Sequence, residues 1–592
     1  MLCTITVVTK SNTIDKLLLG TTVLVTVLVS PSLLEPINLI KLFSLSLGVG
    51  VAGLFLLQKL NKTESFKVER FVFIIVACFL SLAFLSSIIN EQDLYNSAMG
   101  AWGRNNGLIS LTAFLLIFLI FSSVKNQFLP KFLLLNLVVL GFFLSIYAWL
   151  QHFNLDIISV LFPSYQPPGI TLTLGNSNFA SAFLGLTFTA SIGFALNSIN
   201  TKSMRLAALF SGFIHIPLIP LLDTQGRIIF AVGGFIVVGV WLSTIPNRVW
   251  RKISYGYWAF STLIGFLGLS GLFGFGIFSE RLSDDVTNLK DRYYHWISAL
   301  NMMKDNMFFG VGIDAFGDYY RRYRTEESII LRGTAMSGTD NAHNSFLQYG
   351  ATGGVPMLIV YFLLILFIFW RSLKAFKLQS DKRLVGTLFA VWVGYQVQSL
   401  VSIEQIGISI WHWVLSGVLV NLSFESKSVT DKAQEKSVNT QKEIKILPKI
   451  IMAFFSIGLI FSSLFFVLPS ITNDRQINRQ LEILNSANSR EQIVDSINTL
   501  LPLVLSSKQP KLRMTVADTL GRKGFIAEAF KLADQTTKDF PTFLSGWEIA
   551  ATILEGNNQK SEAVYYRTKT VELDPLNQIF IDKLQDDERA SR

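Results

Sequence analysis

Cysteine and histidine are both scarce in this chain. Only 2 of the 592 residues are cysteines, Cys3 and Cys78, and Cys78 lies inside an apolar stretch. The long polar segments contain no cysteine, so disulfide bonds have no part in the predicted fold. The 5 histidines show no metal-ligand spacing, and the sequence therefore predicts no metal site and no cofactor.

Charged residues are also few. They form 16% of the chain, against 51% hydrophobic and 13% aromatic residues, which is too little polar surface for a water-soluble protein of this length. The net charge of +10 is compatible with nucleic-acid binding, but the basic residues concentrate in short connections between apolar stretches. In such connections they orient a membrane protein and meet anionic lipid. We therefore expect membrane lipids, and no nucleic acid, as partners.

Long apolar runs recur along the sequence, each close to the ~20 residues that a membrane-spanning helix needs. They predict thirteen transmembrane helices, within 17–34, 39–57, 71–89, 108–124, 132–150, 179–196, 206–222, 228–245, 257–278, 355–370, 384–403, 408–422 and 450–468. The first run follows Lys10 and Lys16, as in a signal peptide, but it lacks a cleavage site and is predicted to be retained. The predicted fold class is all-α, a polytopic membrane helix bundle.

Lys and Arg alternate between the two sides of this predicted bundle. If the N-terminus is cytoplasmic, the cytoplasmic connections contain clusters of basic residues. The short connections on the other side contain only Arg104 and Arg227. This contrast follows the positive-inside rule, and it predicts that the chain after the last span lies outside the cytoplasm.

Two predicted outer segments are too long to be simple connections. The membrane core, 1–422, contains a large outer loop at 279–350, and long loops are often functional. A polar segment at 423–449 is predicted to be a cytoplasmic linker to the last span, 450–468. The remaining residues, 469–592, form an outer tail.

The outer loop is predicted to contain a short helix over 292–303. Trp296, Leu300 and Met303 have helical spacing, so this helix would lie on the membrane or on the bundle. The glycines in 310–312 are predicted to end it.

The tail carries an internal repeat with a period of 34 residues. The repeated pairs are Ala517 and Ala551, Leu520 and Leu554, Ala529 and Ala563, and Pro541 and Pro575. This is the period of tetratricopeptide (TPR) helix–turn–helix repeats. We therefore predict an extracytoplasmic TPR-like domain, which either docks a protein partner or acceptor or caps the outer face.

Two arginines in outer connections are candidate phosphate-binding residues. Arg227 follows a very short turn at the membrane boundary, and Arg292 lies in the outer loop. A guanidinium matches phosphate oxygens bidentately, so either side chain could grip the phosphates of a lipid-linked substrate. Alternatively, Arg227 anchors its helix to lipid, and Arg292 is an ordinary loop residue.

His343 is the candidate catalytic base. It lies in the run 340–348, shortly before the span at 355–370. A single histidine at a helix entrance usually caps the helix or lies at the surface. Because no other histidine has ligand spacing with His343, a positioned base is the better functional interpretation.

The run 342–356, Ala-His-Asn-Ser-Phe-Leu-Gln-Tyr-Gly-Ala-Thr-Gly-Gly-Val-Pro, resembles the histidine motif of the bacterial O-antigen ligase family. That superfamily also includes O-antigen polymerases and the oligosaccharyltransferases of protein O-glycosylation. Arg292 with Trp296, and then the run 310–316, resemble the segment before this histidine. Weaker matches are the runs 225–227, 175–179 and 103–107, so that the resemblance covers about 100–422. The repeat-bearing tail and one additional span depart from the family pattern.

The resemblance implies that a glycan is transferred from a polyprenyl diphosphate carrier to an acceptor hydroxyl on a lipid, a glycan or a protein. The reaction would take place at the outer face of the bacterial cytoplasmic (inner) membrane. The implied catalytic residues are His343, Arg292 and Arg227, and the substrate-binding candidates are Arg104, Asn178, Asn344 and His295. His343 would take the hydroxyl proton and the arginines would stabilise the departing diphosphate, without a metal.

Two classes of protein compete with this interpretation. A transporter or flippase usually has ionisable groups or broken helices at the bilayer midplane, and His215 with Pro217 and Pro220 is one such candidate. A scaffold would organise other glycan enzymes through the repeats. Turnover of a lipid-linked donor distinguishes an enzyme from both.

Overall fold

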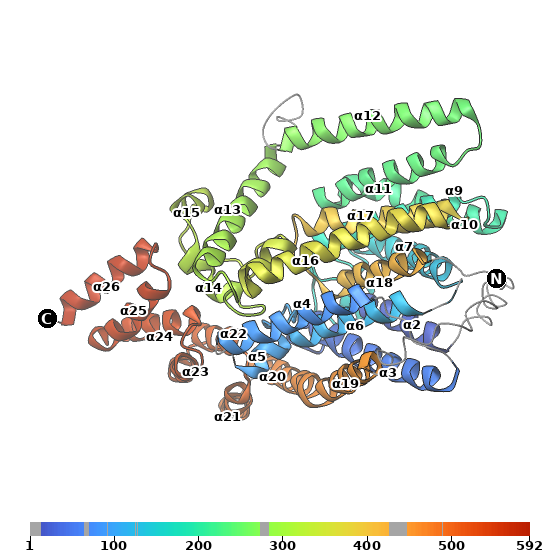
Figure 1. Cartoon of the computed structure of the whole chain (residues 1–592). Coiled ribbons are helices and arrows are strands. Elements are labelled where there is room, and N and C mark those ends of the chain that lie inside the picture. The colour runs from blue at the N-terminus through green and yellow to red at the C-terminus, as the bar shows by residue number, and fades with distance from the viewer. Residues whose placement is uncertain are drawn as a thin grey trace.

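The computed structural model describes residues 13–63, 70–90, 93–124, 126, 128–272, 283–424, 447–487 and 489–591. Every regular element in these ranges is a helix, as the apolar runs predicted, and most of the helices pack side by side in one bundle (Figure 1). The predicted linker at 423–449 lies almost wholly outside the described residues.

A helix lies over each of the thirteen predicted spans. These helices are α2 (Thr13–Val27), α3 (Asn38–Thr63), α4 (Arg70–Ile89), α6 (Leu108–Ser123), α7 (Leu129–His152), α9 (Ser177–Leu196), α10 (Lys202–His215), α11 (Thr224–Ser243), α12 (Arg248–Leu272), α16 (Ser345–Leu378), α17 (Lys382–Ser399), α18 (Ile406–Leu422) and α19 (Leu447–Ser462). By length and composition, 8 helices of the described chain are candidates to cross a membrane, and α6 and α18 are shorter apolar helices. The chain is therefore a multi-pass membrane protein, whereas the count of thirteen stays a prediction.

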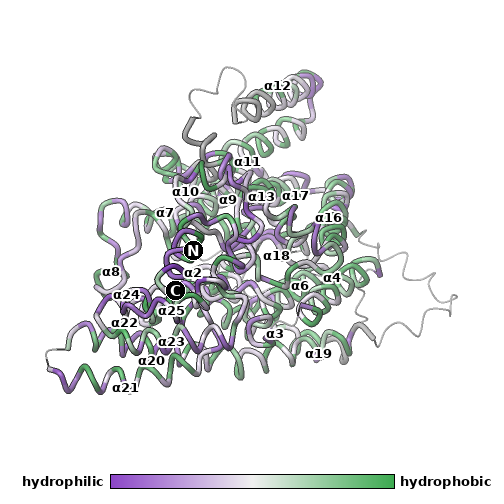
Figure 2. Tube along the Cα trace, turned by 90° about the vertical axis from the view of Figure 1, so that its left-hand side faces the viewer, coloured by the Kyte–Doolittle hydropathy of each residue, from purple (hydrophilic) through white to green (hydrophobic). Residues whose placement is uncertain are grey.

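The centre and the periphery of the bundle differ as expected for a protein in lipid. In α6 and α18 almost every residue is buried, which is why these helices are apolar on all sides. Peripheral helices instead expose large apolar side chains, such as Ile88, Phe143 and Phe454. Figure 2 shows hydrophobic residues along these outer helices, which are suited to face acyl chains.

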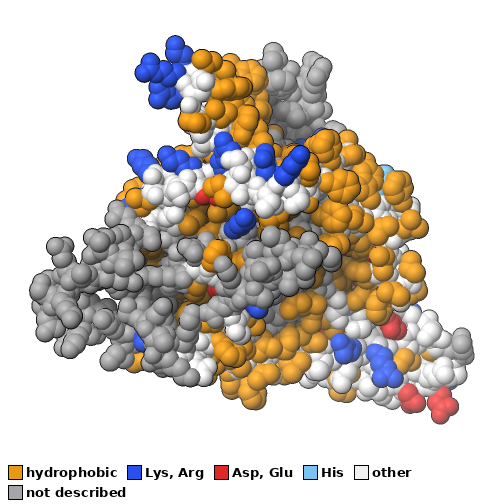
Figure 3. Space-filling view, turned by 90° about the vertical axis from the view of Figure 1, so that its right-hand side faces the viewer, with side chains coloured by type: hydrophobic (Ala, Val, Ile, Leu, Met, Phe, Trp, Pro, Cys, Tyr) orange, Lys and Arg blue, Asp and Glu red, His pale blue; other side chains and the backbone are white. Residues whose placement is uncertain are grey.

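The two ends of the bundle carry different elements. One end, here called the loop end, holds α13 (Ser283–Asp305), α14 (Phe316–Tyr323), α15 (Glu326–Arg332) and the C-terminal helices (Figure 1). The opposite end carries the connections from α11 to α12 and from α16 to α17. Lys and Arg side chains gather there, as Figure 3 shows. The basic connections predicted to be cytoplasmic therefore lie together at this end, and the orientation of the bundle stays a prediction.

The helix predicted over 292–303 is part of the longer α13, which runs from Ser283 to Asp305. After it the chain turns through Gly310 and Gly312, both with positive φ, and meets α16. There Val311 N donates to Ala351 O and Gly312 N donates to Thr352 O, at 2.9 and 3.0 Å.

α16 is kinked near its start. Gly354 has φ 85° and ψ 170°, and Pro356 follows it, so a short first segment is set off from the long helix behind it. The kink leaves carbonyl groups of the first segment without helical donors. Val311, Gly312 and the hydroxyl of Ser86 supply donors instead. The histidine motif is thereby fixed to the outer loop.

The tail consists of further helices. They are α20 (Leu468–Ser486), α21 (Arg490–Ser506), α22 (Pro510–Arg522), α23 (Ile526–Asp539), α24 (Leu544–Gly556), α25 (Lys560–Leu573) and α26 (Gln578–Ser591). α24 begins and ends 34 residues after α22 (510 to 544, 522 to 556), and α25 follows α23 by the same interval (526 to 560, 539 to 573). The helix boundaries thus share the period of the sequence repeat, and the TPR assignment stays a prediction.

Candidate active site

His343 is held in an uncommon backbone conformation at the loop end. Its φ is 52°, in the left-handed region that residues other than glycine adopt uncommonly, with asparagine, aspartate and histidine the most frequent exceptions. Neighbouring side chains impose this conformation. Asn341 Oδ1 accepts from His343 N at 2.9 Å, and Gln348 Oε1 accepts from Ala342 N at 2.9 Å. Strain of this kind is common at functional sites.

The ring of His343 stacks on the ring of His295, which α13 supplies. The two ring centroids are 5.1 Å apart and the ring planes are 29° from parallel. His295 is 2% exposed, and the edge of its ring meets Tyr320 of α14. The structure therefore brings together two histidines that lie 48 positions apart (295 to 343) in the sequence.

Arg332 fixes His295 from the other side. Its Nη2 lies 2.7 Å from His295 Nε2, while Nε and Nη2 also donate to the two carboxylate oxygens of Asp291 at 2.6 and 2.8 Å. Arg332 Nη1 reaches Gly338 O at 3.3 Å. One guanidinium thus connects α13, α15 and the segment that leads to His343.

Arg104 lies beside the same segment. It forms a bidentate ion pair with Asp340, in which Nε and Nη2 donate at 2.9 and 3.0 Å. Burial would raise the pKa of Asp340, but Arg104 holds it below its usual range, with help from Lys511. Two donors of the Arg104 guanidinium are therefore occupied by a carboxylate, and a phosphate would have to share this arginine with Asp340.

The surroundings favour a neutral His343. Burial, together with the nearby His295, Arg292 and Arg104, lowers the pKa of His343 to about 3. Burial likewise lowers the pKa of His295 to about 4. His343, His295, Arg292 and Arg104 are thus four predicted site residues that the structure brings into one electrostatic cluster.

Arg227 and Asn178 lie in the first turns of two helices, α11 and α9, that contact each other where they begin. Arg227 is an exposed side chain in the first turn of α11, whose Asp223 N donates to Ser181 Oγ of α9 at 2.9 Å. Asn178 is half-buried in the first turn of α9. Both predicted residues therefore lie where α9 and α11 begin together.

The side chain of Asn344 is engaged in the fold. Its Oδ1 accepts from Leu347 N at 3.1 Å and so caps α16, and its Nδ2 donates to Leu400 O at 3.0 Å. These contacts give Asn344 a clear role in placing His343 against α17. Its proposed contact with substrate would need a further hydrogen bond.

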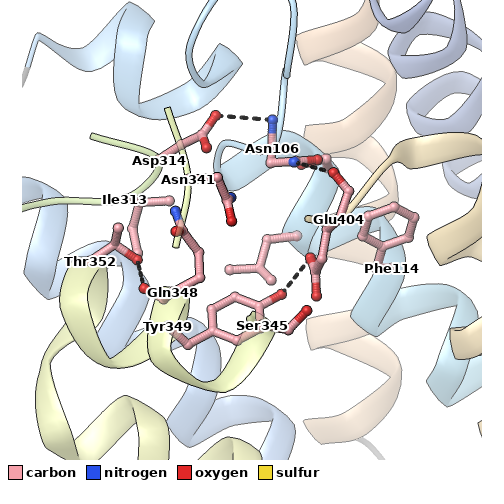
Figure 4. A pocket seen from close by; sticks show the side chains of 12 residues that line it. Asn106, Phe114, Ile313, Asp314, Asn341, Ser345, Gln348, Tyr349, Thr352 and Glu404 are labelled. Atoms are coloured by element: carbon pink, nitrogen blue, oxygen red, sulfur yellow. Dashed lines mark hydrogen bonds between the residues drawn. The ribbon is translucent and has the colours of Figure 1, made fainter. Parts of the chain in front are cut away.

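A small cavity lies under the histidine motif (Figure 4). Its volume is about 30 Å³, room for ordered water rather than for a sugar ring. The polar lining includes Asn106, Asp314, Asn341, Ser345, Tyr349 and Glu404. Burial raises the pKa of both Asp314 and Glu404 to about 7. The cavity beside the histidine motif is therefore too small for a sugar substrate.

Three of the residues around His343 were not predicted from the sequence. Asp291, Arg332 and Asp340 are ordinary charged residues of a polar loop, and only the position of Asp340 within the histidine run was a signal. Within the described ranges, no group of three or more His, Cys, Asp or Glu side chains could hold a metal ion.

The family model described as O-antigen ligase matches residues 206–362, a stretch that includes α13, His295 and His343. With the apolar helix bundle, this match defines a membrane protein of the glycosyltransferase type. Over these residues the chain is similar to the O-antigen ligase superfamily, whose members use a glycan-linked lipid as donor. No curated protein matches the chain.

Proposed function

We propose that the chain transfers a glycan from a polyprenyl diphosphate carrier to an acceptor hydroxyl at the outer face of the bacterial cytoplasmic membrane. The observation that carries this proposal is His343, strained in backbone and stacked on His295, in a cluster with Arg292 and Arg104. Such a cluster combines an uncharged base with fixed cations. In this orientation the N-terminus is cytoplasmic, and the loop end with the TPR-like tail is extracytoplasmic.

In this reaction His343 accepts a proton, whereas the arginines stabilise negative charge. The acceptor oxygen attacks the anomeric carbon, the bond from that carbon to the diphosphate oxygen breaks, and its electron pair leaves with the diphosphate. The hydroxyl proton passes to a ring nitrogen of His343. Arg292 and Arg227 stabilise the charge that develops on the diphosphate, with Arg104 as a further contact.

Donor binding also activates the base. Without donor, burial and the nearby cations depress the pKa of His343, which makes it a weak proton acceptor. A diphosphate bound to Arg292 and Arg104 places negative charge in the cluster and offsets their effect. The pKa of His343 then rises toward the range in which general bases work best.

The arginines supply the positive charge that a divalent metal supplies in many phosphate sites, so we propose a metal-independent reaction. The acceptor is a lipid, a growing glycan or a protein. These acceptors correspond to ligase, polymerase and oligosaccharyltransferase activities of the same superfamily.

Donor turnover tests the proposal. Purified protein in detergent is mixed with a radiolabelled polyprenyl diphosphate oligosaccharide, a bacterial membrane extract as acceptor source, and excess EDTA. We expect release of free polyprenyl diphosphate and movement of label to an acceptor. A donor that stays intact both with and without EDTA, in the presence of folded protein, would instead favour a transporter or scaffold, whereas turnover only without EDTA would contradict the metal-independent reaction.

A further inference from the structure

The contact between Arg332 and His295 determines which nitrogen of His295 carries a proton. A guanidinium can only donate hydrogen bonds. At 2.7 Å from Arg332 Nη2, His295 Nε2 must therefore accept, and the single ring proton lies on Nδ1, which is buried without a hydrogen-bond partner among the described residues. Asp291 keeps the guanidinium in place through two short contacts of its own, at 2.6 and 2.8 Å.

This arrangement also opposes protonation of His295. A second proton on the ring would have to go on Nε2, where the Arg332 N–H already points. The positive charge of Arg332 acts in the same direction, and so does burial of the ring. Asp291, 3.7 Å from Nε2, favours the charged ring, and Asp340 does so more weakly.

We propose that the Arg332–Asp291 pair is a positioning device that keeps His295 neutral, as its Nδ1–H tautomer, so that the ring stacked on His343 stays uncharged. The inference rests on the proposed role of His343 as base. A charged His295 ring, 5.1 Å away, would repel a proton arriving on His343 and would stop it from accepting one. Arg332 and Asp291 are therefore positioning residues for the reaction, without contact to the reacting atoms.

The charged and titratable groups around the two rings come from five elements. They are Asp291 and Arg292 of α13, Tyr320 of α14, Arg332 of α15, Asp340 in the segment before α16, and Arg104 in the segment before α6. Asp340 is paired with Arg104, and Asp291 with Arg332. Removing Arg332 leaves Asp291 as an unpaired carboxylate beside His295, which then favours the charged ring.

Histidine tautomers give the first test, which needs no activity. Protein labelled with ¹⁵N-histidine is reconstituted in nanodiscs, and the His295 signals are assigned by comparison with His295→Phe. In the native chain we expect a neutral Nδ1–H ring from about pH 7.5 to about pH 5.5. In Arg332→Gln we expect His295 to be protonated at about pH 5.5, below the ordinary histidine pKa of about 6.5. A protonated His295, or the Nε2–H tautomer, in the native chain would overturn the proposal.

The pH dependence of transfer gives the second test, in the assay with radiolabelled donor. Between about pH 7.5 and about pH 5.5, Arg332→Gln should lose about tenfold more of its rate than the native chain loses, because about 90% of an ordinary histidine is protonated at the lower pH. The double variant Arg332→Gln/His295→Phe keeps an aromatic ring without a titrating group at position 295 and should return to the pH profile of the native chain. Arg322→Gln, an exposed arginine of α14, is the matched control.

The two tests distinguish failure of the positioning role from failure of the proposed function. An equal loss of rate by Arg332→Gln at both pH values, or an acid-side loss greater than that of the native chain that persists in the double variant, would overturn the positioning role. Absence of transfer in the native chain would count against the proposed function, whereas the tautomer measurement would still decide whether Arg332 holds His295 neutral.

Discussion

At the residue scale, the conformation of His343 depends on side chains close to it in sequence, whereas the side chains around its ring come from distant parts of the chain. Its left-handed backbone, the capping amide of Asn344 and the acceptor on Asn341 all lie within one short run, so the sequence could identify this run as special. The sequence could not identify the partners of the run. Arg332 can be identified as a site residue only from its contact with His295, and Asp340 only from its ion pair with Arg104.

The phosphate-binding role of Arg292 and Arg227 can be tested by substitution with lysine, which preserves the positive charge. Lysine keeps the positive charge but loses the planar fork that binds two phosphate oxygens. We expect Arg292→Lys and Arg227→Lys each to slow transfer on the order of 10²-fold, the low end for loss of one donor to a developing charge. Arg322→Lys on α14 serves as the control and should be unaffected. Native rates in both variants, at equal protein level, would show that these arginines serve topology.

At the scale of elements, the kinked start of α16 and the glycine turn after α13 form one unit. Gly310 has φ 61°, and a Cβ at this position would lie 2.4 Å from the carbonyl carbon of Thr352. The close approach allows Val311 and Gly312 to bond the carbonyls freed by the kink at Gly354. The run Gly-Val-Gly was predicted to end a helix, whereas its pairing with the histidine motif depends on tertiary contact.

Gly310→Ala should therefore destabilise the protein. The left-handed backbone alone costs a non-glycine residue roughly 1–2 kcal/mol, and the clash with Thr352 adds to this. Thermal unfolding in detergent should show a clearly lower midpoint and reduced transfer. Gly234→Ala in α11, where a Cβ has open space, should leave the midpoint unchanged or raise it slightly. Equal midpoints for the two variants would contradict the proposed close approach.

At the scale of the whole molecule, the tail packs directly on the outer loop. Arg324 Nη2 donates to Asp574 Oδ1 at 2.6 Å, and both side chains are almost fully buried. Arg324 Nη1 also donates to the carbonyls of Ala335 and Ser337, in the segment that leads to Asp340. A second contact joins Lys511 of the tail to Asp340 at 3.5 Å. The tail therefore supports the loop, whether or not it also docks a partner.

Asp574→Ala should uncouple the tail from the loop. Removal of one partner of a buried ion pair typically costs about 3–5 kcal/mol, because the other charge stays buried. We expect faster proteolysis within 324–340 and slower transfer, with the membrane helices intact. Asp582→Ala, an exposed tail carboxylate, should behave like the native chain. Native protease resistance of Asp574→Ala would mean that the loop does not depend on this contact.

The orientation of the molecule can be measured separately. Ser561 is exposed on α25, and the proposed topology places it outside the cytoplasm. Ser561→Cys, in a chain with Cys3 and Cys78 replaced, should react with a membrane-impermeant maleimide on intact spheroplasts. Labelling only after lysis would show that the number of spans is even and that the tail is cytoplasmic.

The whole fold was more predictable than the site. Apolar runs locate every helix of the bundle because a lipid-facing or buried helix must be apolar over its length. α13 was predicted too short, since its first turns are polar and lack the apolar spacing of 292–303. The contacts of Arg324 with Asp574 and of Arg332 with Asp291 join residues distant in sequence, so no local sequence pattern predicts them.

The most direct test of the account is replacement of His343 by asparagine. Asparagine tolerates a left-handed backbone but cannot act as a base at neutral pH, so the fold and donor binding should persist while the chemistry fails. We expect His343→Asn to bind the polyprenyl diphosphate donor with native affinity and to transfer its glycan roughly 10²–10⁴-fold more slowly. A folded His343→Asn variant that transfers glycan at the native rate would contradict the central claim.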